Sequence, residues 1–162
     1  MNGYGLPMYV NVDYPFEDQQ PYVRMKAGLK NSVGSYRRDF TLPAGWENKR
    51  VFLHFDGIYS AAYVYVNGNE VGYTEGANNV SEFDITKYLR TGKNNVAVQV
   101  IRWSDGSYLE GQDMWHMSGI HRDVYLVATP KTYLADHYIK ATVTPGSTTV
   151  ATGSAATSVD LT

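Results

Sequence analysis

Hydrophobic and polar residues alternate with a period of two in several short stretches of this chain, the period expected of β-strands. In Arg50–Phe55 (RVFLHF), for example, Val51, Leu53 and Phe55 share one face. Comparable patterns predict further strands at Ser35–Leu42, Ala61–Val66, Glu70–Tyr73, Glu82–Leu89, Asn95–Trp103 and Arg122–Ala128. No window long enough for an ordinary helix shows an apolar stripe along one side. The pattern therefore predicts an all-β, antiparallel β-sandwich.

The dipeptide Asn67–Gly68 lies between two of these predicted strands. Both residue types tolerate the positive φ that a type I′ turn requires at its two central positions. The sequence therefore predicts a two-residue β-hairpin at this point.

The two ends of the chain differ from its centre. Residues 1–30 lack periodicity and are interrupted by prolines, which predicts an extended segment whose aromatic side chains, such as Tyr14 and Phe16, lie on an apolar surface. Tyr133–Val143 predicts one or two strands, and the chain becomes rich in Thr, Ser, Ala and Gly from Thr144. So short a final segment cannot bury a core of its own. We interpret it as the start of a further domain of a longer protein.

Composition excludes several functional classes. The 162 residues carry a formal net charge of −2, which argues against nucleic acid and against an anionic membrane surface as partners. The chain has no cysteine, which excludes disulfides and thiolate chemistry but is compatible with any compartment, because secreted proteins can also lack cysteine. Its four histidines lack zinc-site spacing, and no glycine-rich phosphate loop is present. The 14 tyrosines suit both β-strands and the flat faces of sugar rings.

The segment Arg102–Asp123 (RWSDGSYLEGQDMWHMSGIHRD) is a long irregular loop, and such loops are often functional. Two interpretations of its carboxylates remain open. Glu110 and Asp113 could act as a general acid and a nucleophile, or they could anchor the loop. Asp105 and the neighbouring aromatic residues could instead offer hydrogen-bond acceptors and stacking faces to a sugar.

This segment also carries a resemblance to a known family. Arg102–Val124 closely resembles a run found in the N-terminal jelly-roll domain of family 2 glycoside hydrolases, specifically in their β-galactosidase branch. Agreement extends to Pro7–Phe16 (PMYVNVDYPF), Asn31–Tyr36 (NSVGSY) and Phe55–Asp84, and covers about residues 4–130. The resemblance implies a jelly-roll, or galactose-binding-like, antiparallel sandwich. It assigns residues 1–131 to a sugar-binding domain with an early strand missing, and residues 132–162 to a linker and the incomplete start of an immunoglobulin-like domain.

The resemblance also implies two substrate-binding residues. Asn31 and Asp105 match family positions that contact the galactosyl ring, and the position of Asp105 also binds sodium. An amide and a carboxylate suit sugar hydroxyls, and a carboxylate suits a hard cation. Ser32 stands where the family usually has a proline after the asparagine. No cofactor is expected in this chain itself, whereas sodium and magnesium are expected in the parent enzyme.

The same resemblance places the catalytic glutamates of a retaining β-galactosidase in a TIM barrel outside residues 1–162. The chain alone is therefore predicted to be inactive, with no catalytic residue of its own. Its expected partners are galactosides and downstream domains of the same polypeptide, in a parent that forms a homo-oligomer. Two alternatives remain open: an autonomous carbohydrate-binding module, and a purely structural domain used in assembly.

Overall fold

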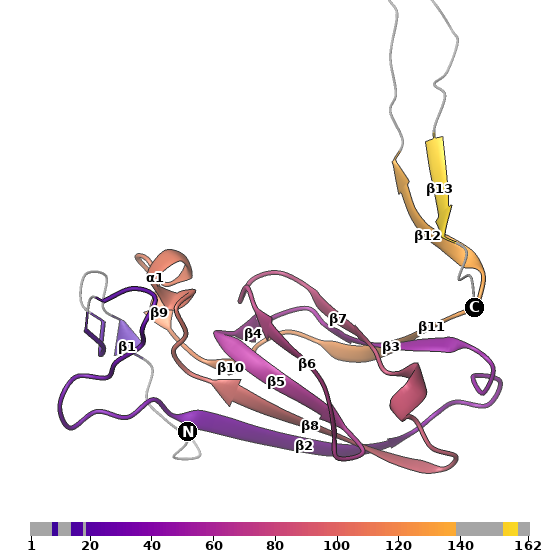
Figure 1. Ribbon diagram of the computed structural model, residues 1–162, viewed down its shortest axis with the longest axis horizontal. Helices are drawn as coiled ribbons and strands as arrows, with labels where there is room; N and C mark the ends of the chain where they lie inside the picture. Colours follow the sequence, from indigo (N-terminus) through magenta and orange to yellow (C-terminus); the bar gives the residue numbers. More distant parts are fainter. Residues whose placement is uncertain (1–7, 10–13, 18, 139–153, 159–162) are drawn as a thin grey trace, which may run out of the picture.

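The computed structural model describes residues 8, 9, 14–17, 19–138 and 154–158 (Figure 1). The strands are β1 (Met8–Tyr9), β2 (Val33–Thr41), β3 (Arg50–Phe55), β4 (Ile58–Tyr59), β5 (Ala61–Val66), β6 (Asn69–Glu75), β7 (Ser81–Asp84), β8 (Lys93–Ile101), β9 (Trp115–His116), β10 (Gly119–Ile120), β11 (Val124–Thr129), β12 (Tyr133–Tyr138) and β13 (Ser154–Ser158). Helical structure among these residues is limited to the turn α1 (Ser107–Glu110) and the 3-10 turn η1 (Thr86–Tyr88). None of the described helices is long and apolar enough to span a membrane.

The sandwich consists of two antiparallel sheets that share one core. One sheet has four strands in the order β2-β8-β5-β6, and the other has three in the order β11-β3-β7. The alternation seen in the sequence places one face of β3, β5 and β8 inward. The buried core comprises Val51, Leu53, Phe55, Ile58, Ala62, Val64, Val66, Ile85, Val98 and Val100. The predicted all-β antiparallel sandwich is thereby confirmed.

The predicted hairpin at Asn67–Gly68 is also confirmed. Val66 pairs with Asn69 across a two-residue loop, and φ is 52° at Asn67 and 85° at Gly68. The Asn67 amide donates hydrogen bonds to the Tyr88 carbonyl at 2.8 Å and to the Asn94 side-chain oxygen at 2.7 Å. These bonds connect the turn to the segment that leads into β8.

The prediction of one strand over Glu82–Leu89 was wrong in its second half. Strand β7 ends at Asp84, whose carboxylate accepts hydrogen bonds from the Thr86 amide at 3.0 Å and the Thr86 hydroxyl at 2.6 Å. This local turn competes with the strand and starts η1. Strand β8 also begins and ends two residues earlier than predicted, because the chain turns out of the sheet before Trp103.

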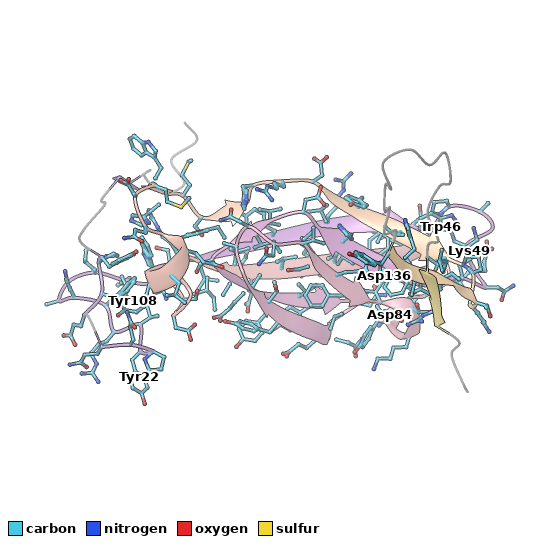
Figure 2. All side chains as sticks on the ribbon, turned by 90° about the horizontal axis from the view of Figure 1, so that it is seen from above. Tyr22, Trp46, Lys49, Asp84, Tyr108 and Asp136 are labelled. Carbon is cyan, nitrogen blue, oxygen red and sulfur yellow. The ribbon has the colours of Figure 1, made fainter. Side chains whose placement is uncertain are left out.

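The long loop contains short elements that its sequence does not indicate. It forms α1, β9, which pairs with β1, and β10, which pairs with β4. At the other end of the chain, β12 and β13 pair with each other and extend away from the sandwich (Figure 1). The remaining C-terminal residues lie outside the described residues, so the division at residues 131 and 132 stays a prediction. Figure 2 shows Tyr22 and Tyr108 at one end of the molecule and Trp46, Lys49, Asp84 and Asp136 at the other.

Candidate functional site

Asn31 holds the base of the long loop against the start of β2. Its side-chain amide donates to the Trp103 carbonyl at 2.8 Å, and its side-chain oxygen accepts from the Trp103 amide at 3.0 Å. Beside this pair, the Arg102 amide donates to the Ser32 carbonyl at 3.0 Å. The hydrogen bonding between β2 and β8 thus continues beyond the ends of both strands, and the Asn31 side chain forms the last pair of these bonds. Asn31 is fixed by these bonds although the following residue is not proline.

An aromatic cluster supports Trp103 from the other side. Trp103 is 3% exposed, and its ring lies 5.6 Å from that of Phe16 and 5.1 Å from that of His116. Tyr14 stacks on Phe16 at 5.0 Å, and the Tyr108 hydroxyl donates to a backbone carbonyl of the same N-terminal segment. The prediction that aromatic side chains of this segment lie on an apolar surface holds for Tyr14 and Phe16 but is wrong for Tyr22, which is 69% exposed. This packing fixes the loop just before Asp105.

Asp105 lies in an exposed turn that leads into α1. One oxygen of its carboxylate accepts a hydrogen bond from the Gly106 amide at 3.1 Å, and its backbone carbonyl accepts one from the Tyr108 amide at 3.2 Å. The same carboxylate also interacts with the Glu75 carboxyl group. A carboxylate has about four acceptor positions, so the remaining ones are available to a ligand. Asn31 binds the backbone two residues before Asp105, and the structure therefore brings both predicted residues to one loop. No hydrogen bond between their two side chains occurs in the described part of the chain.

Two residues beside Asp105 were not anticipated from the sequence. The Tyr73 hydroxyl donates a short hydrogen bond to the Glu75 carboxylate, at the end of β6. Burial and the nearby carboxylates of Asp105 and Glu110 raise the pKa of Glu75, against the opposing effect of the Tyr73 hydrogen bond. Burial and the Glu75 carboxylate raise the pKa of Tyr73. The surroundings of Asp105 thus contain more carboxyl groups than the loop sequence alone indicates.

Glu110 anchors the loop. One of its carboxylate oxygens accepts a hydrogen bond from the amide of the buried Ala77 at 3.1 Å. This geometry favours the anchoring interpretation of Glu110 over a role in a catalytic pair with Asp113. Asp113 adopts a positive φ of 54° in the turn that follows α1.

Asp105 can supply only part of a cation site. Hard cations such as sodium and magnesium prefer several oxygen ligands. Across the residues that the structure describes, no group of three or more His, Cys, Asp or Glu side chains is arranged to hold a metal ion. Asp105 would therefore contribute one carboxylate to a site completed by other groups. The sodium role of Asp105 and the magnesium expected in the parent enzyme both stay predictions.

The sequence matches one protein family over most of its length. The profile described as "Glycosyl hydrolases family 2, sugar binding domain" matches residues 1–130. A protein named β-galactosidase from Priestia megaterium is 45% identical over 144 residues, which are 88% of this chain and 14% of that protein. A β-galactosidase from Yersinia pestis bv. Antiqua (strain Angola) is 45% identical over 146 residues, or 90% of this chain and 14% of that protein. The chain thus spans about 14% of the length of these relatives.

Solved structures with a similar fold carry related names. The β-glucuronidase of Bacteroides uniformis has a TM-score of 0.63 and 32% identity, covering 69% of this chain and 14% of that one. A β-glucuronidase from an uncultured Clostridium sp. has a TM-score of 0.65 and 30% identity, covering 71% of this chain and 22% of that one. From its sequence and its fold together, the chain belongs to glycosyl hydrolase family 2, and residues 1–130 correspond to the sugar-binding domain of that family.

Proposed function

We propose that the chain is the N-terminal sugar-binding domain of a retaining β-galactosidase, which removes terminal non-reducing β-D-galactose from galactosides. The observation that carries this proposal is the exposed carboxylate of Asp105, on a loop whose base is fixed by Asn31 and Trp103. Two relatives named β-galactosidase are 45% identical to this chain, whereas the two solved structures named β-glucuronidase described above are 32% and 30% identical. This difference favours a galactoside over a glucuronide as substrate.

Asp105 would accept hydrogen bonds from galactosyl hydroxyl groups, and it would add one oxygen to a bound sodium ion. The Asn31 side chain uses one N–H and one oxygen lone pair in its hydrogen bonds to Trp103. A second N–H and a second lone pair remain unused in these bonds. Its first role is therefore to position the loop, and its remaining groups can contact the sugar. Both residues would orient the galactosyl ring, while the reaction itself requires other groups.

The catalytic carboxyl groups would come from another part of the polypeptide. A retaining glycosidase uses two carboxyl groups about 5–5.5 Å apart, one as acid/base and one as nucleophile. Glu110 accepts a hydrogen bond from the Ala77 amide and Glu75 one from the Tyr73 hydroxyl, which favours structural roles for both. We assign the pair to a TIM barrel downstream, and we expect the 162-residue chain alone to release no product from an aryl β-galactoside.

The surface around α1 supports contact with downstream domains. Leu109 is 84% exposed, Met117 is 61% exposed and Trp115 is 54% exposed, all on the loop that carries Asp105. Grouped exposed apolar side chains are typical of interaction surfaces. Packing of a barrel on this surface would place Asp105 at the domain boundary, where ligand sites are common. Assembly of the parent as a homo-oligomer stays a prediction.

The test uses the complete polypeptide that carries this chain. We expect it to hydrolyse an aryl β-D-galactoside with a kcat/KM far above that for the matching aryl β-D-glucuronide. A preference for the glucuronide would contradict the galactoside assignment. Absence of hydrolysis of either compound by the folded polypeptide would favour a binding or assembly role instead.

A further inference from the structure

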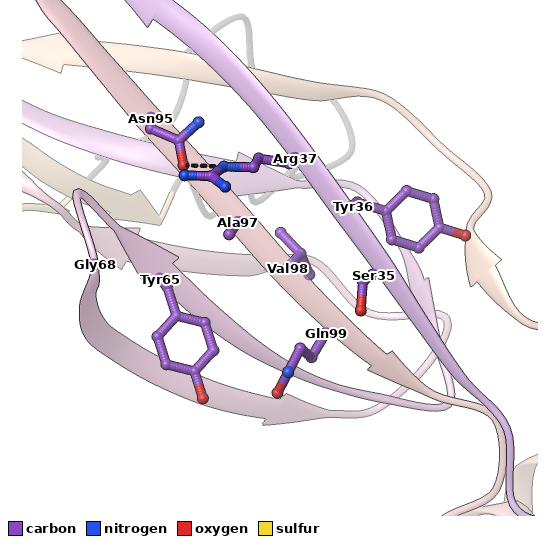
Figure 3. A pocket seen from close by; sticks show the side chains of 9 residues that line it. All are labelled: Ser35, Tyr36, Arg37, Tyr65, Gly68, Asn95, Ala97, Val98 and Gln99. Carbon is purple, nitrogen blue, oxygen red and sulfur yellow. Dashed lines mark hydrogen bonds between the residues drawn. The ribbon is translucent and has the colours of Figure 1, made fainter.

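The face of the four-stranded sheet that points away from the core contains a hollow of about 370 Å³. It is lined by Ser35, Tyr36, Arg37, Tyr65, Gly68, Asn95, Ala97, Val98 and Gln99, and is called the outer hollow below (Figure 3). These residues come from β2, β8 and the β5–β6 hairpin, and none is Asn31 or Asp105. The volume lies at the lower end of the range for small-molecule sites.

The hollow exists because one small side chain lies between two large ones. Ala97 in the central strand β8 pairs with Arg37 on one side and with Tyr65 on the other. Since side chains alternate between the faces of a strand, Ala97 points outward while its neighbour Val98 is buried in the core. Ala97 therefore forms the floor, and Arg37 and Tyr65 form opposite walls.

The walls offer one aromatic face and several hydrogen-bonding groups. Figure 3 shows Tyr65, Gln99 and Ser35 projecting toward the same side from three neighbouring strands. Arg37 reaches across to Asn95, where its Nε donates to the side-chain oxygen at 3.1 Å. The terminal amino groups of Arg37 and the side chains of Gln99 and Ser35 make no other hydrogen bond within the described part of the chain, and all three residues are exposed. They are therefore available to a ligand.

The charges around the hollow favour a neutral ligand. Arg37 is the one cationic group in its lining, and Glu70 pairs with Tyr65 at its edge. Partial desolvation and, after it, the Glu70 carboxylate raise the pKa of the Tyr65 hydroxyl, and the negative charge of Glu70 lies next to the ring. The Asp39 carboxylate, whose pKa is lowered by hydrogen bonds with Lys93 and Asn95 and by the charges of Lys93 and Arg37, partly balances the charge of Arg37. A single cation balanced in this way is a poor site for an anion. An aromatic face opposite uncharged amide and hydroxyl groups suits a ligand that combines C–H surface with hydroxyl groups.

We propose that the outer hollow is a binding site for a neutral saccharide, with one pyranose ring on Tyr65 and its hydroxyl groups bonded to Gln99, Ser35 and Arg37. The site lies on a different part of the sheet from Asp105. Strand β8 runs four residues from Ala97 to its end at Ile101, about 13 Å at the rise of a β-strand. Binding in the outer hollow therefore does not require the Asp105 loop, and the proposal does not depend on the proposed function.

The test is an NMR titration of the isotope-labelled 162-residue chain with lactose, cellobiose and inorganic phosphate, each separately. We expect saturable shifts of the Arg37, Ala97 and Gln99 amides with both disaccharides and none with phosphate. Tyr65→Ala and Gln99→Ala should each weaken this binding about three- to tenfold, because each removes one stacking or hydrogen-bonding contact. Tyr65→Phe should retain it, since the ring remains.

Two control variants separate the outer hollow from other surfaces. Tyr22→Ala removes a tyrosine that is 69% exposed at one end of the molecule, and Asp105→Ala removes the carboxylate of the proposed galactoside site. Both should leave the saturable shifts of the Ala97 and Gln99 amides unchanged. Shifts confined to the amides near Asp105, shifts with phosphate alone, or equal losses in Gln99→Ala and Tyr22→Ala would each overturn the proposal. Gln99 is exposed, so its variant keeps the test valid if Tyr65→Ala unfolds.

Discussion

Asn31→Ala should lower the free energy of unfolding by about 2–3 kcal/mol. The substitution removes both hydrogen bonds between the Asn31 side chain and the Trp103 backbone, at 2.8 and 3.0 Å. An unpaired buried donor or acceptor costs about 1–3 kcal/mol. Asn31 itself is only partly buried, so water can reach part of the space that its side chain leaves. The combined loss for the two hydrogen bonds is therefore expected near the low end of the range obtained by adding their separate costs.

The assay is urea denaturation followed by circular dichroism, with Asn69→Ala as the matched control. The Asn69 amide makes only long hydrogen bonds of 3.4 Å to the Val66 and Asn67 carbonyls. Asn69→Ala should therefore lower the free energy of unfolding by less than about 0.5 kcal/mol. Asn31→Asp keeps an acceptor for the Trp103 amide but turns a carboxylate oxygen toward the Trp103 carbonyl. It should therefore also be less stable than the wild type at neutral pH. Equal stabilities of Asn31→Ala and Asn69→Ala would refute the role assigned to Asn31.

Three further outcomes are expected. Gly68→Val should lower the free energy of unfolding by about 1–2 kcal/mol, because φ is 85° at this turn position, and Gly68→Asn should lower it by less. Equal thermal midpoints for the two variants would argue against strain at this turn. The hydrogen bonds from Thr86 and the ion pair with Arg50, at 2.9 Å, outweigh burial and hold the pKa of Asp84 below its ordinary value. This stabilisation is present above the unfolded-state pKa of about 3.9 and is lost as the pH falls through the lower folded-state value, so Asp84→Asn should flatten the loss of stability measured by urea denaturation in acid. The 162-residue chain should show no turnover of an aryl β-galactoside, and activity that disappears in Glu110→Gln would contradict the assignment of catalysis to another domain.

Local patterns predicted most of the sandwich. Strands β3 and β5 have the predicted bounds, and the Asn67–Gly68 turn was predicted from residue type alone. These elements depend on alternation and turn chemistry, which are properties of adjacent residues. The error after Asp84 had a local signal as well, because an aspartate two residues before a threonine can form a side-chain turn that ends a strand.

The contacts that shape the candidate site are between residues far apart in the sequence. Asn31 binds Trp103, and Glu75 approaches Asp105, only after the sheet has brought β2, β6 and β8 together. Sequence spacing carries no information about such pairs. The short strand β9 likewise depends on its pairing with β1 rather than on its own two residues. The resemblance to a family predicted Asn31 and Asp105 as site residues, whereas the acidic neighbour Glu75 was found only in the structure.

Asp105 is the residue on which the proposed function depends most, and Asp136 offers a matched control. Both are exposed aspartates whose carboxylate accepts a hydrogen bond from the next backbone amide, at 3.1 Å for Asp105 and 2.7 Å for Asp136. Asp136 lies at the opposite end of the molecule from Tyr108 and α1 (Figure 2). Any effect that Asp105→Ala has beyond Asp136→Ala therefore reflects its position at the site rather than the loss of an exposed carboxylate bonded to the next amide.

The most direct measurement is kcat/KM for an aryl β-galactoside in the complete polypeptide, comparing the wild type, Asp105→Ala and Asp136→Ala. Loss of a charge-assisted hydrogen bond to the sugar costs about 1.5–3 kcal/mol, so Asp105→Ala should lower kcat/KM about ten- to a hundredfold and raise KM. The wild type should also respond to sodium more strongly than Asp105→Ala does. Asp136→Ala should match the wild type. A folded Asp105→Ala enzyme with wild-type kcat/KM would show that Asp105 only anchors its loop, and would contradict the proposed sugar-binding role.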